Sequence, residues 1–201
     1  MTRENIIQNS LKQFLLNGIR KMTIQQIVAP LGISTKTVYK YFSGKEDLLE
    51  ACLLIHYEKM SLGFNNLMAS SYNPAEKLFL LFFMSLEEDF KVAPVFYHDL
   101  NYYYPEMQDK VIARYFENNS QYIIDVFNKG IEQGFFRPEL NTTVVLTALH
   151  LLYRSLTRTG EYREFNLSPF EMASNTLVVY LRGICTPKGI KILDNLKYLS
   201  P

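Results

Sequence analysis

Two short helical segments joined by a glycine, residues 23–41, constrain the fold more than any other stretch of the chain. Thr23 is suited to an N-cap, and apolar residues follow it at the spacing of one helix face until Gly32 interrupts the pattern. Ser34 is placed to cap the next helix, which carries Val38 on its inner face. Because two short helices around a glycine turn form a helix-turn-helix unit, we predict that this part of the chain binds DNA.

The second helix of the pair begins with short polar side chains, and this is the end that such a unit inserts into the major groove. Thr35, Lys36 and Thr37 lie there, where hydroxyl groups can reach phosphates or bases and a threonine methyl can pack on a thymine methyl. Tyrosine hydroxyls and a lysine near the other end of the helix are suited to phosphate oxygens. These further predicted contacts are Tyr39, Lys40 and Tyr41.

A fourth helix is predicted to begin in the stretch "SGKEDLL" and to run to about Met68. Ser43 would cap it, and Glu46 follows three residues later as in a capping box. Lys45 lies in the first turn, where its positive charge opposes the helix dipole. A phosphate bound at this helix end would explain the lysine, so Lys45 is also a predicted DNA contact.

The stretch "MTIQQIVAPLGISTKTVYKYFSGKEDLL" resembles the DNA-binding domain of the tetracycline-repressor (TetR) family of regulators, over roughly residues 4–52. The positions that match the family pattern are Thr23, Ile27, Gly32, Ile33, Ser34, Thr37, Val38, Tyr39, Tyr41, Phe42, Lys45, Leu48 and Leu49. The resemblance implies a DNA-binding domain at residues 1–52 and a ligand-binding and dimerisation domain at residues 53–201. It also implies DNA contacts by Thr23, Gln25, Thr35, Lys36, Thr37, Tyr39, Lys40, Tyr41 and Lys45.

Some side chains of this segment have a second interpretation. Phe42 and Tyr39 are also suited to packing the recognition helix on the fourth helix, and Lys36 is equally suited to a base or a phosphate. Lys36 departs from the family pattern, in which a small residue is common. Pro30 also departs from it, and we predict that this proline distorts the last turn of the second helix because it removes a backbone hydrogen bond.

Apolar positions recur at helical spacing through most of the chain, which predicts an all-α, TetR-like fold with about nine or ten helices. Pro74 is predicted to begin one helix, and a long helix is predicted from about Pro105 to Gln133. Two further helices are expected near residues 143–159 and 168–183, with a short one after "TPKG". The stretches "VFYH" and "TTVVLT" have strand-like composition but fit better inside helices. The stretches "GFFRPEL" and "YLRGICTPKG" resemble turns of family members.

A helix-turn-helix protein commonly binds as a dimer, because two copies on a two-fold axis read a palindromic operator. The helices near residues 143–183 offer broad apolar faces for a homodimer, and the family resemblance implies the same surface. The alternative for each residue is the core of its own subunit. The residues concerned are Leu146, Leu149, Leu152, Tyr153, Leu156, Leu177, Val178, Leu181 and Ile184.

A regulator also needs an input, and aromatic residues cluster in the middle of the chain. Rings with polar tips suit a mostly apolar pocket, so we predict a small apolar or aromatic effector. The family resemblance implies a repressor that this effector releases from its operator, with activation as the alternative. Packing in helix cores explains most of these rings equally well. The candidate ligand-binding residues are Phe82, Phe83, Phe96, Tyr97, Tyr115, Tyr122 and Tyr153.

Charge and composition agree with double-stranded DNA as the partner of the N-terminal part alone. Residues 1–50 carry seven Lys/Arg and four Asp/Glu, whereas the remainder carries fourteen and sixteen. The two cysteines lie far apart, there is no signal peptide, and no apolar run is long enough to span a membrane, so a cytoplasmic location is expected. No motif indicates a cofactor or a metal site.

Two other classes of function remain open from the residues alone. A helical enzyme could use His98, Asp99 and Glu87, or Cys52, although no nucleotide-binding or nucleophile–base motif accompanies them. A helical module that binds proteins is the second alternative, and it leaves the polar segment from Thr35 to Lys45 unexplained.

Overall fold

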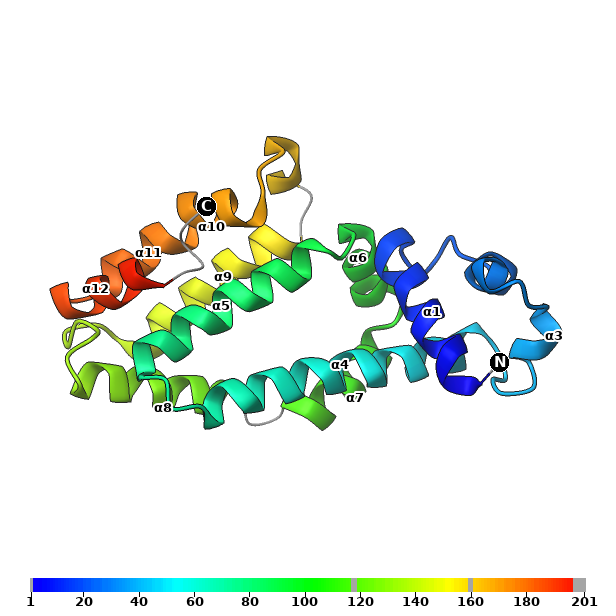
Figure 1. Ribbon diagram of the computed structural model, residues 1–201, viewed down its shortest axis with the longest axis horizontal. Helices are drawn as coiled ribbons and strands as arrows, with labels where there is room; N and C mark the ends of the chain where they lie inside the picture. Colours follow the sequence, from blue (N-terminus) through cyan, green and yellow to red (C-terminus); the bar gives the residue numbers. More distant parts are fainter. Residues whose placement is uncertain (1, 117–118, 159–160, 197–201) are drawn as a thin grey trace. The chain divides into compact units, whose positions relative to one another are not determined.

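The computed structural model describes residues 2–116, 119–158 and 161–196, and helices account for nearly all of the regular structure in them (Figure 1). A single β-bridge joins Phe136 and Cys185. The elements in chain order are α1 (Arg3–Asn17), α2 (Ile24–Val28), η1 (Ala29–Leu31), α3 (Thr35–Val38), α4 (Lys45–Ala69), α5 (Pro74–Phe90), α6 (Pro94–Tyr103), α7 (Pro105–Phe116), α8 (Asn119–Glu132), α9 (Thr142–Arg158), η2 (Glu161–Phe165), α10 (Pro169–Asn175), α11 (Leu177–Ile184) and α12 (Pro187–Asn195). The predicted all-α fold is confirmed.

Local signals placed several helix ends correctly. Gly18 ends α1 with a φ of 80°, and Pro74 is the first residue of α5. α4 ends at Ala69, close to the predicted Met68. The strand-like stretches "VFYH" and "TTVVLT" lie inside α6 and α9, because a periodic apolar face outweighs β-branched composition over a longer window.

Two predicted helices are each divided in the structure, so the described residues hold more helices than nine or ten. The helix expected from Pro105 to Gln133 is α7 and α8, and the second of them begins at Asn119. The helix expected near residues 168–183 is α10 and α11. Thr176 separates these two with φ −131° and ψ −81°, and its hydroxyl donates to the carbonyl of Met172 at 2.6 Å.

The predicted capping box before α4 is also corrected. Ser43 donates through its backbone N–H to the Asp47 carboxylate at 2.8 Å and through its hydroxyl at 3.2 Å. α4 begins at Lys45, one residue later than the box required. Asp47 therefore takes the position expected for Glu46, because the shift of one residue carries Glu46 out of reach of Ser43.

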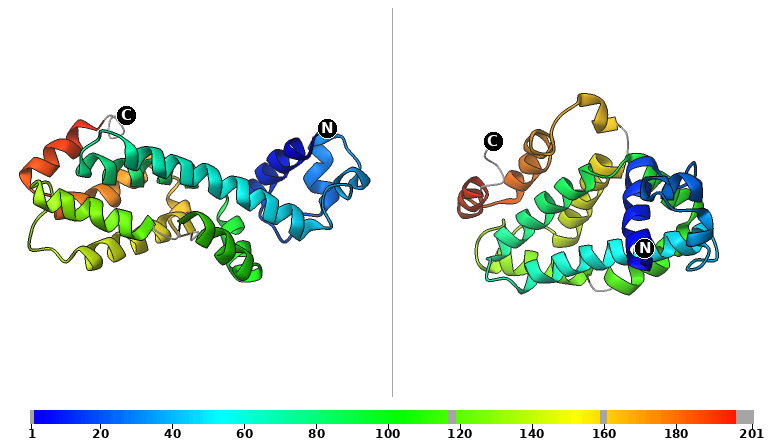
Figure 2. Two further views of the ribbon diagram at one scale, coloured as in Figure 1. Left: turned by 90° about the horizontal axis from the view of Figure 1, so that it is seen from below. Right: turned by 45° about the vertical axis from the view of Figure 1, so that its right-hand side comes forward.

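Packing divides the chain into two compact units. The first comprises Met1–Gly63 and Lys91–Glu117, and the second comprises Phe64–Phe90 and Asn118–Pro201. α4 contributes to both, while α6 and α7 belong to the first (Figure 2). The division by function at residue 52 stays a prediction, since these units follow packing alone.

The second unit is organised around α5, which packs against α8, α9, α10 and α12. Phe127 of α8 stacks on Phe136 with ring centroids 4.6 Å apart. This close approach requires a glycine at position 130, where a Cβ atom would lie 2.3 Å from the Phe136 ring. Backbone hydrogen bonds from Arg137 to Ile184 and from Thr186 to Phe135, both 3.0 Å, join the "GFFRPEL" and "YLRGICTPKG" stretches.

Candidate nucleic-acid interface

The head, defined here as residues 3–52, presents one face of α3 to solvent because the opposite face is buried. Val38 of α3 has 0% exposure and Phe42, just after it, has 2%. They pack in one cluster with Phe14 of α1, Ile27 of α2 and Leu49 of α4. Val38 is the last residue of α3, and Phe42 follows the turn after it. Because both are buried, α3 is held in one orientation about its axis, and the packing role predicted for Phe42 is confirmed.

Thr23 and Gln26 form a capping box at the beginning of α2. The Thr23 hydroxyl accepts from the backbone N–H of Gln26 at 3.3 Å, and the Gln26 side-chain oxygen accepts from the backbone N–H of Thr23 at 2.9 Å. The predicted N-cap is therefore confirmed. Thr23 and Gln25 both remain exposed, so the cap leaves their outer atoms accessible.

Pro30 reshapes the end of the second helix as the sequence predicted. The α-helix stops at Val28, and Ala29–Leu31 continue as a 3₁₀ turn that contains the proline. Gly32 follows with φ 62° and ψ 24°, a left-handed conformation that favours glycine. The turn between α2 and α3 is thus built by these two residues, Pro30 and Gly32.

The recognition helix is shorter than predicted, because α3 spans only Thr35–Val38 instead of reaching Tyr41. A turn follows, in which the backbone N–H groups of Tyr41 and Phe42 both donate to the Val38 carbonyl. The side chains of Lys36, Tyr39, Lys40 and Tyr41 are exposed, and those of Thr35 and Thr37 are half-buried. Tyr39 is 57% exposed, so most of its ring lies outside the core.

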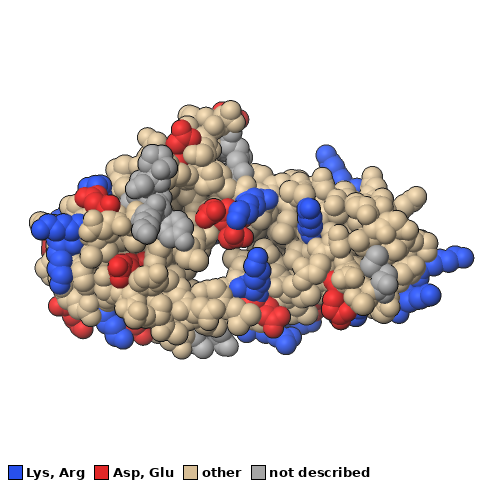
Figure 3. Space-filling model, viewed as in Figure 1, with Lys and Arg blue, Asp and Glu red and all other residues tan. Residues whose placement is uncertain are grey.

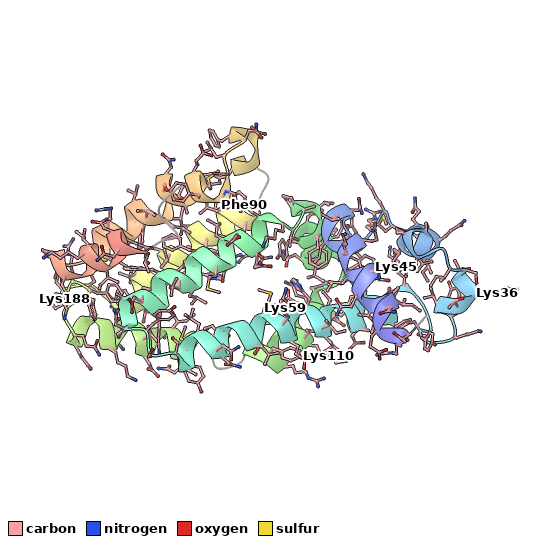
Figure 4. All side chains as sticks on the ribbon, viewed as in Figure 1. Lys36, Lys45, Lys59, Phe90, Lys110 and Lys188 are labelled. Carbon is pink, nitrogen blue, oxygen red and sulfur yellow. The ribbon has the colours of Figure 1, made fainter. Side chains whose placement is uncertain are left out.

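These exposed groups make an array of donors around α3. Lys36 lies at the tip of the head (Figure 4), and Lys and Arg side chains protrude from the same end of the head (Figure 3). No ion pair joins Lys36 or Lys40 to a carboxylate among the described residues. The Thr37 hydroxyl shares a hydrogen bond with the Ser34 hydroxyl at 3.3 Å. The ammonium and phenol groups held on this edge are suited to phosphates and base edges.

Lys45 differs from the other predicted contacts, because it has a partner within the chain. Its Nζ donates to the backbone carbonyl of Arg20 at 3.2 Å, and the side chain is half-buried. Burial lowers the pKa of Lys45, and the nearby negative charge of Asp99 partly opposes this shift. The ammonium group keeps two further protons for a phosphate, so a DNA contact by Lys45 stays a prediction.

Asp99 of α6 holds the turn between α1 and α2, a role that the sequence did not reveal. Its buried carboxylate accepts from the backbone N–H groups of Ile19 and Arg20, both at 2.8 Å. Gly18 lies against it, since a Cβ there would be 3.0 Å from the same carboxylate oxygen. No local pattern links residues 80 positions apart, so a sequence signal for this contact was not available.

Comparison with known proteins agrees with this geometry. The family model described as bacterial regulatory proteins, tetR family, matches residues 6–52. The head matches the TetR family. The matched residues contain α2, α3 and the turn that joins them, and they coincide with the resemblance found in the sequence.

Similarity to known proteins extends beyond the head. The HTH-type transcriptional repressor KstR2 of Mycolicibacterium smegmatis is 26% identical over 199 residues, which cover 94% of this chain and 93% of the relative. KstR2 of Mycobacterium tuberculosis is 27% identical over 149 residues, covering 71% and 73%. The solved structure of the latter, titled a ketosteroid transcriptional regulator, aligns with a TM-score of 0.66 at 23% identity, covering 92% and 95% of the two chains.

The candidate effector residues are distributed over the two units. Phe96, Tyr97 and Tyr115 belong to the first unit, where Phe96 and Tyr97 are buried in the cluster that holds the head. In the second unit Phe83 is buried, and Phe82 and Tyr153 form an edge-to-face pair with centroids 6.0 Å apart. Rings serve the core in both units, and helical periodicity alone does not assign a ring to a pocket.

A groove in the second unit has a volume of about 600 Å³. It runs between the last turns of α4, the beginning of α5 and one side of α8. Tyr122 is the only one of the seven effector candidates on its wall. The other lining side chains include Phe64, Met68, Tyr72, Lys77 and Lys129.

The apolar faces predicted for a dimer are partly internal. Leu149, Leu156, Leu177, Leu181 and Ile184 are buried in the core of the second unit, as the alternative interpretation stated. Leu146, Leu152, Tyr153 and Val178 are half-buried. The apolar side chains that α9 and α11 expose are instead Val144, Leu151 and Val179, each close to 60% accessible.

A buried polar cluster lies between α5 and α9. The Tyr153 hydroxyl donates to the Asp89 carboxylate at 2.5 Å, and an Arg158 guanidinium nitrogen lies 3.2 Å from the same oxygen. Burial and the negative charge of Asp89 raise the pKa of Tyr153 above its ordinary range. The phenol therefore stays protonated and acts as a donor.

Two of the residues considered for enzyme chemistry, Cys52 and Asp99, are buried and used within the fold, whereas Glu87 and His98 are exposed. Cys52 is buried and its thiol donates to the Ile7 carbonyl at 3.5 Å, and burial raises its pKa far above the ordinary value. Asp99 is used by the backbone of Ile19 and Arg20. Within the described ranges, no three His, Cys, Asp or Glu side chains are placed to hold a metal ion. In that same part of the chain no helix is long and apolar enough to cross a membrane.

Proposed function

We propose that the chain is a transcriptional repressor that binds a palindromic operator as a homodimer. The observation that carries this proposal is the exposed edge of the head, where Lys36, Lys40 and Tyr41 have no described carboxylate partner while Val38 and Phe42 hold the opposite face in the core. The full contact set proposed is Thr23, Gln25, Thr35, Lys36, Thr37, Tyr39, Lys40, Tyr41 and Lys45. Regulation of transcription places the protein with the DNA, in the cytoplasm.

The homodimer is proposed to form through α9 and α11. Val144 and Leu151 lie seven residues apart, about two turns of α9, and so they share a face of that helix. α9 packs beside α11, which exposes Val179. Exposed apolar side chains on two adjacent helices are the feature expected of an interface between two copies.

The effector is proposed to be a small apolar or aromatic molecule that binds in the second unit. The groove beside Tyr122 and Phe64 supports an apolar body with a polar edge, because lysines lie among its rings. α4 begins at Lys45 in the head, and its last turns line this groove. A ligand that displaces α4 would therefore alter the placement of the head and weaken operator binding.

A transcription assay tests the repressor proposal. A duplex selected by the protein from a random pool is placed across a promoter, and transcription is measured in vitro with increasing protein. Repression that requires the selected sequence supports the proposal. Equal transcription from promoters with and without that sequence, at protein concentrations that saturate it, contradicts repression.

The effector proposal is tested by a thermal-shift screen followed by a release assay. The screen includes fused-ring steroids, since a relative of similar fold is titled a ketosteroid regulator, together with monocyclic aromatic and fatty compounds. A compound that raises the melting temperature should also release the selected duplex. Tyr122→Ala and Tyr72→Ala each remove a ring that lines the groove, and each should weaken binding of that compound. A stabilising compound that binds equally well to both variants would place the effector outside this groove.

A further inference from the structure

Arg3 connects the beginning of α1 with the residue that ends the recognition turn. Its guanidinium carbon lies 5.1 Å from the centroid of the Phe42 ring, although 39 positions separate the two residues. Phe42 is buried and Arg3 is exposed, so the ring supports the guanidinium group from the protein side. Figure 2 shows the first turn of α1 in the same region as the helix-turn-helix.

The charge of Arg3 is not explained by its own helix. Arg3 is the first residue of α1, whose N-terminal end disfavours a cation. Thr2 already supplies the cap by accepting from the backbone N–H of Asn5. No ion pair within the described residues involves Arg3. The guanidinium group therefore stacks on one ring and points its donors to solvent at a helix end that favours an anion.

Tyr41 is a second neighbour of the same ring. Its ring centroid is 6.5 Å from that of Phe42, and 43% of its surface is exposed. Phe42 thus has both a phenol and a guanidinium beside it, two donors that bind phosphate oxygens. A guanidinium can bind a phosphate with two parallel hydrogen bonds, and stacking on a ring reduces the freedom that it loses when it does so.

We propose that Arg3 is a phosphate contact of the head, and that it binds the DNA backbone next to the phosphate reached by Tyr41. The Phe42 ring positions the guanidinium group for this contact. The inference rests on the proposed DNA-binding function and adds the N-terminal turn of α1 to the docking surface. It predicts that Arg3 contributes affinity for every duplex and little preference among sequences.

Arg3→Met and Lys12→Met make a matched pair of neutral variants. Methionine keeps an apolar stem against Phe42 and removes the charge. Lys12 is exposed on the same helix, about 13 Å further along and on the opposite side of the axis, because nine residues span two and a half turns. Arg3→Gln is a second neutral variant, and Arg3→Lys retains the charge without the planar guanidinium group.

The experiment measures the affinity of the full chain for a duplex selected from a random pool, over a series of salt concentrations. Loss of one phosphate contact per head should reduce the steepness of log affinity against log salt by about 0.9 for each head. At about 0.15 M salt this is roughly fivefold in affinity for one head and about thirtyfold for a dimer with two heads. Arg3→Met and Arg3→Gln should show this change, and Arg3→Lys should keep the slope. Lys12→Met should match the wild type.

Three results would overturn the inference, and they differ from failure of the proposed function. A wild-type slope for Arg3→Met and Arg3→Gln would leave Arg3 with a packing role alone, the more so if their melting temperature falls. An equal loss for Lys12→Met would indicate a general effect of charge, and a changed order of preference among duplexes would indicate a base contact. A wild-type protein that binds no duplex at all would instead refute DNA binding itself.

Discussion

Polar side chains are used in opposite ways by the head and by the second unit. Around α3, Lys36 and Lys40 extend into solvent without a described carboxylate partner. In the second unit, Asp89, Tyr153 and Arg158 contact one another inside the protein. Exposed donors are satisfied by water and stay available to another molecule, whereas buried polar groups must find partners within the fold. The comparison therefore assigns recognition to the first set and stability to the second.

The largest effect is expected where the second unit buries a charge. Asp89→Ala should lower the free energy of unfolding by about 3 kcal/mol, because it leaves Arg158 and Tyr153 without a buried carboxylate that both use. Urea denaturation measures the change. The control is Asp194→Ala, which removes an exposed ion pair with Arg182 and should cost less than about 1 kcal/mol. Equal losses for the two variants would contradict the structural role of Asp89.

A glycine pair sharpens the same comparison through packing. Gly130→Ala should destabilise the protein by about 1–3 kcal/mol, because the added methyl group overlaps the Phe136 ring that stacks on Phe127. Gly63→Ala, in the middle of α4 with open space around it, should stabilise by up to about 1 kcal/mol. Thermal or urea unfolding distinguishes the two signs, and destabilisation by both would show that α4 does not tolerate a side chain at position 63.

In the head, substitutions of exposed lysines should change recognition and leave stability within about 0.5 kcal/mol of the wild type. Lys40→Ala is expected to weaken binding to all duplexes by roughly fivefold for each head, or about thirtyfold for the dimer, as for one lost phosphate contact per head. Lys36→Ala is expected to change the order of preference among duplexes, as loss of a base contact would. Titration of labelled duplexes measures both. If either lysine substitution unfolds the protein, these exposed side chains serve stability and not recognition.

The smallest effect expected is on pH dependence. Burial and the positive charge of Arg154 lower the pKa of His150, so the unfolded chain binds a proton at that residue more readily than the folded one. Stability should therefore decrease as the pH falls through the ordinary histidine range. His150→Gln should remove this part of the dependence, and the two proteins should have the same pH response near pH 8. An unchanged slope below pH 7 in the variant would place the titration elsewhere.

Features of the fold that depend on neighbouring residues could be predicted from the sequence. Thr23, Pro30 and Gly32 each act through the backbone within a few positions, so the cap, the 3₁₀ turn and the left-handed glycine follow from their identities. The capping partner of Ser43 was wrong by a single residue, because α4 begins at Lys45. The break at Thr176 depends on a side-chain hydrogen bond that competes with the helix, and helical periodicity continues across it.

The effector site could not be predicted for a different reason. Phe96 and Phe83 are both buried helix residues, yet one lies in the core of the first unit and the other in that of the second. Asp99 reaches Ile19 and Arg20 across 80 positions, and only the packed structure brings them together. Local sequence determines helices and caps well, whereas the partner of a buried side chain depends on tertiary packing.

Competition binding tests the central claim most directly, namely that the edge of the head around α3 reads DNA sequence. The selected duplex is labelled, and unlabelled copies of the same duplex or of a scrambled one compete for the protein at about 0.15 M salt. A sequence-specific regulator should prefer its own site by at least about a thousandfold. That preference should fall for Lys36→Ala. Equal competition by the two duplexes for the wild-type protein would contradict the account.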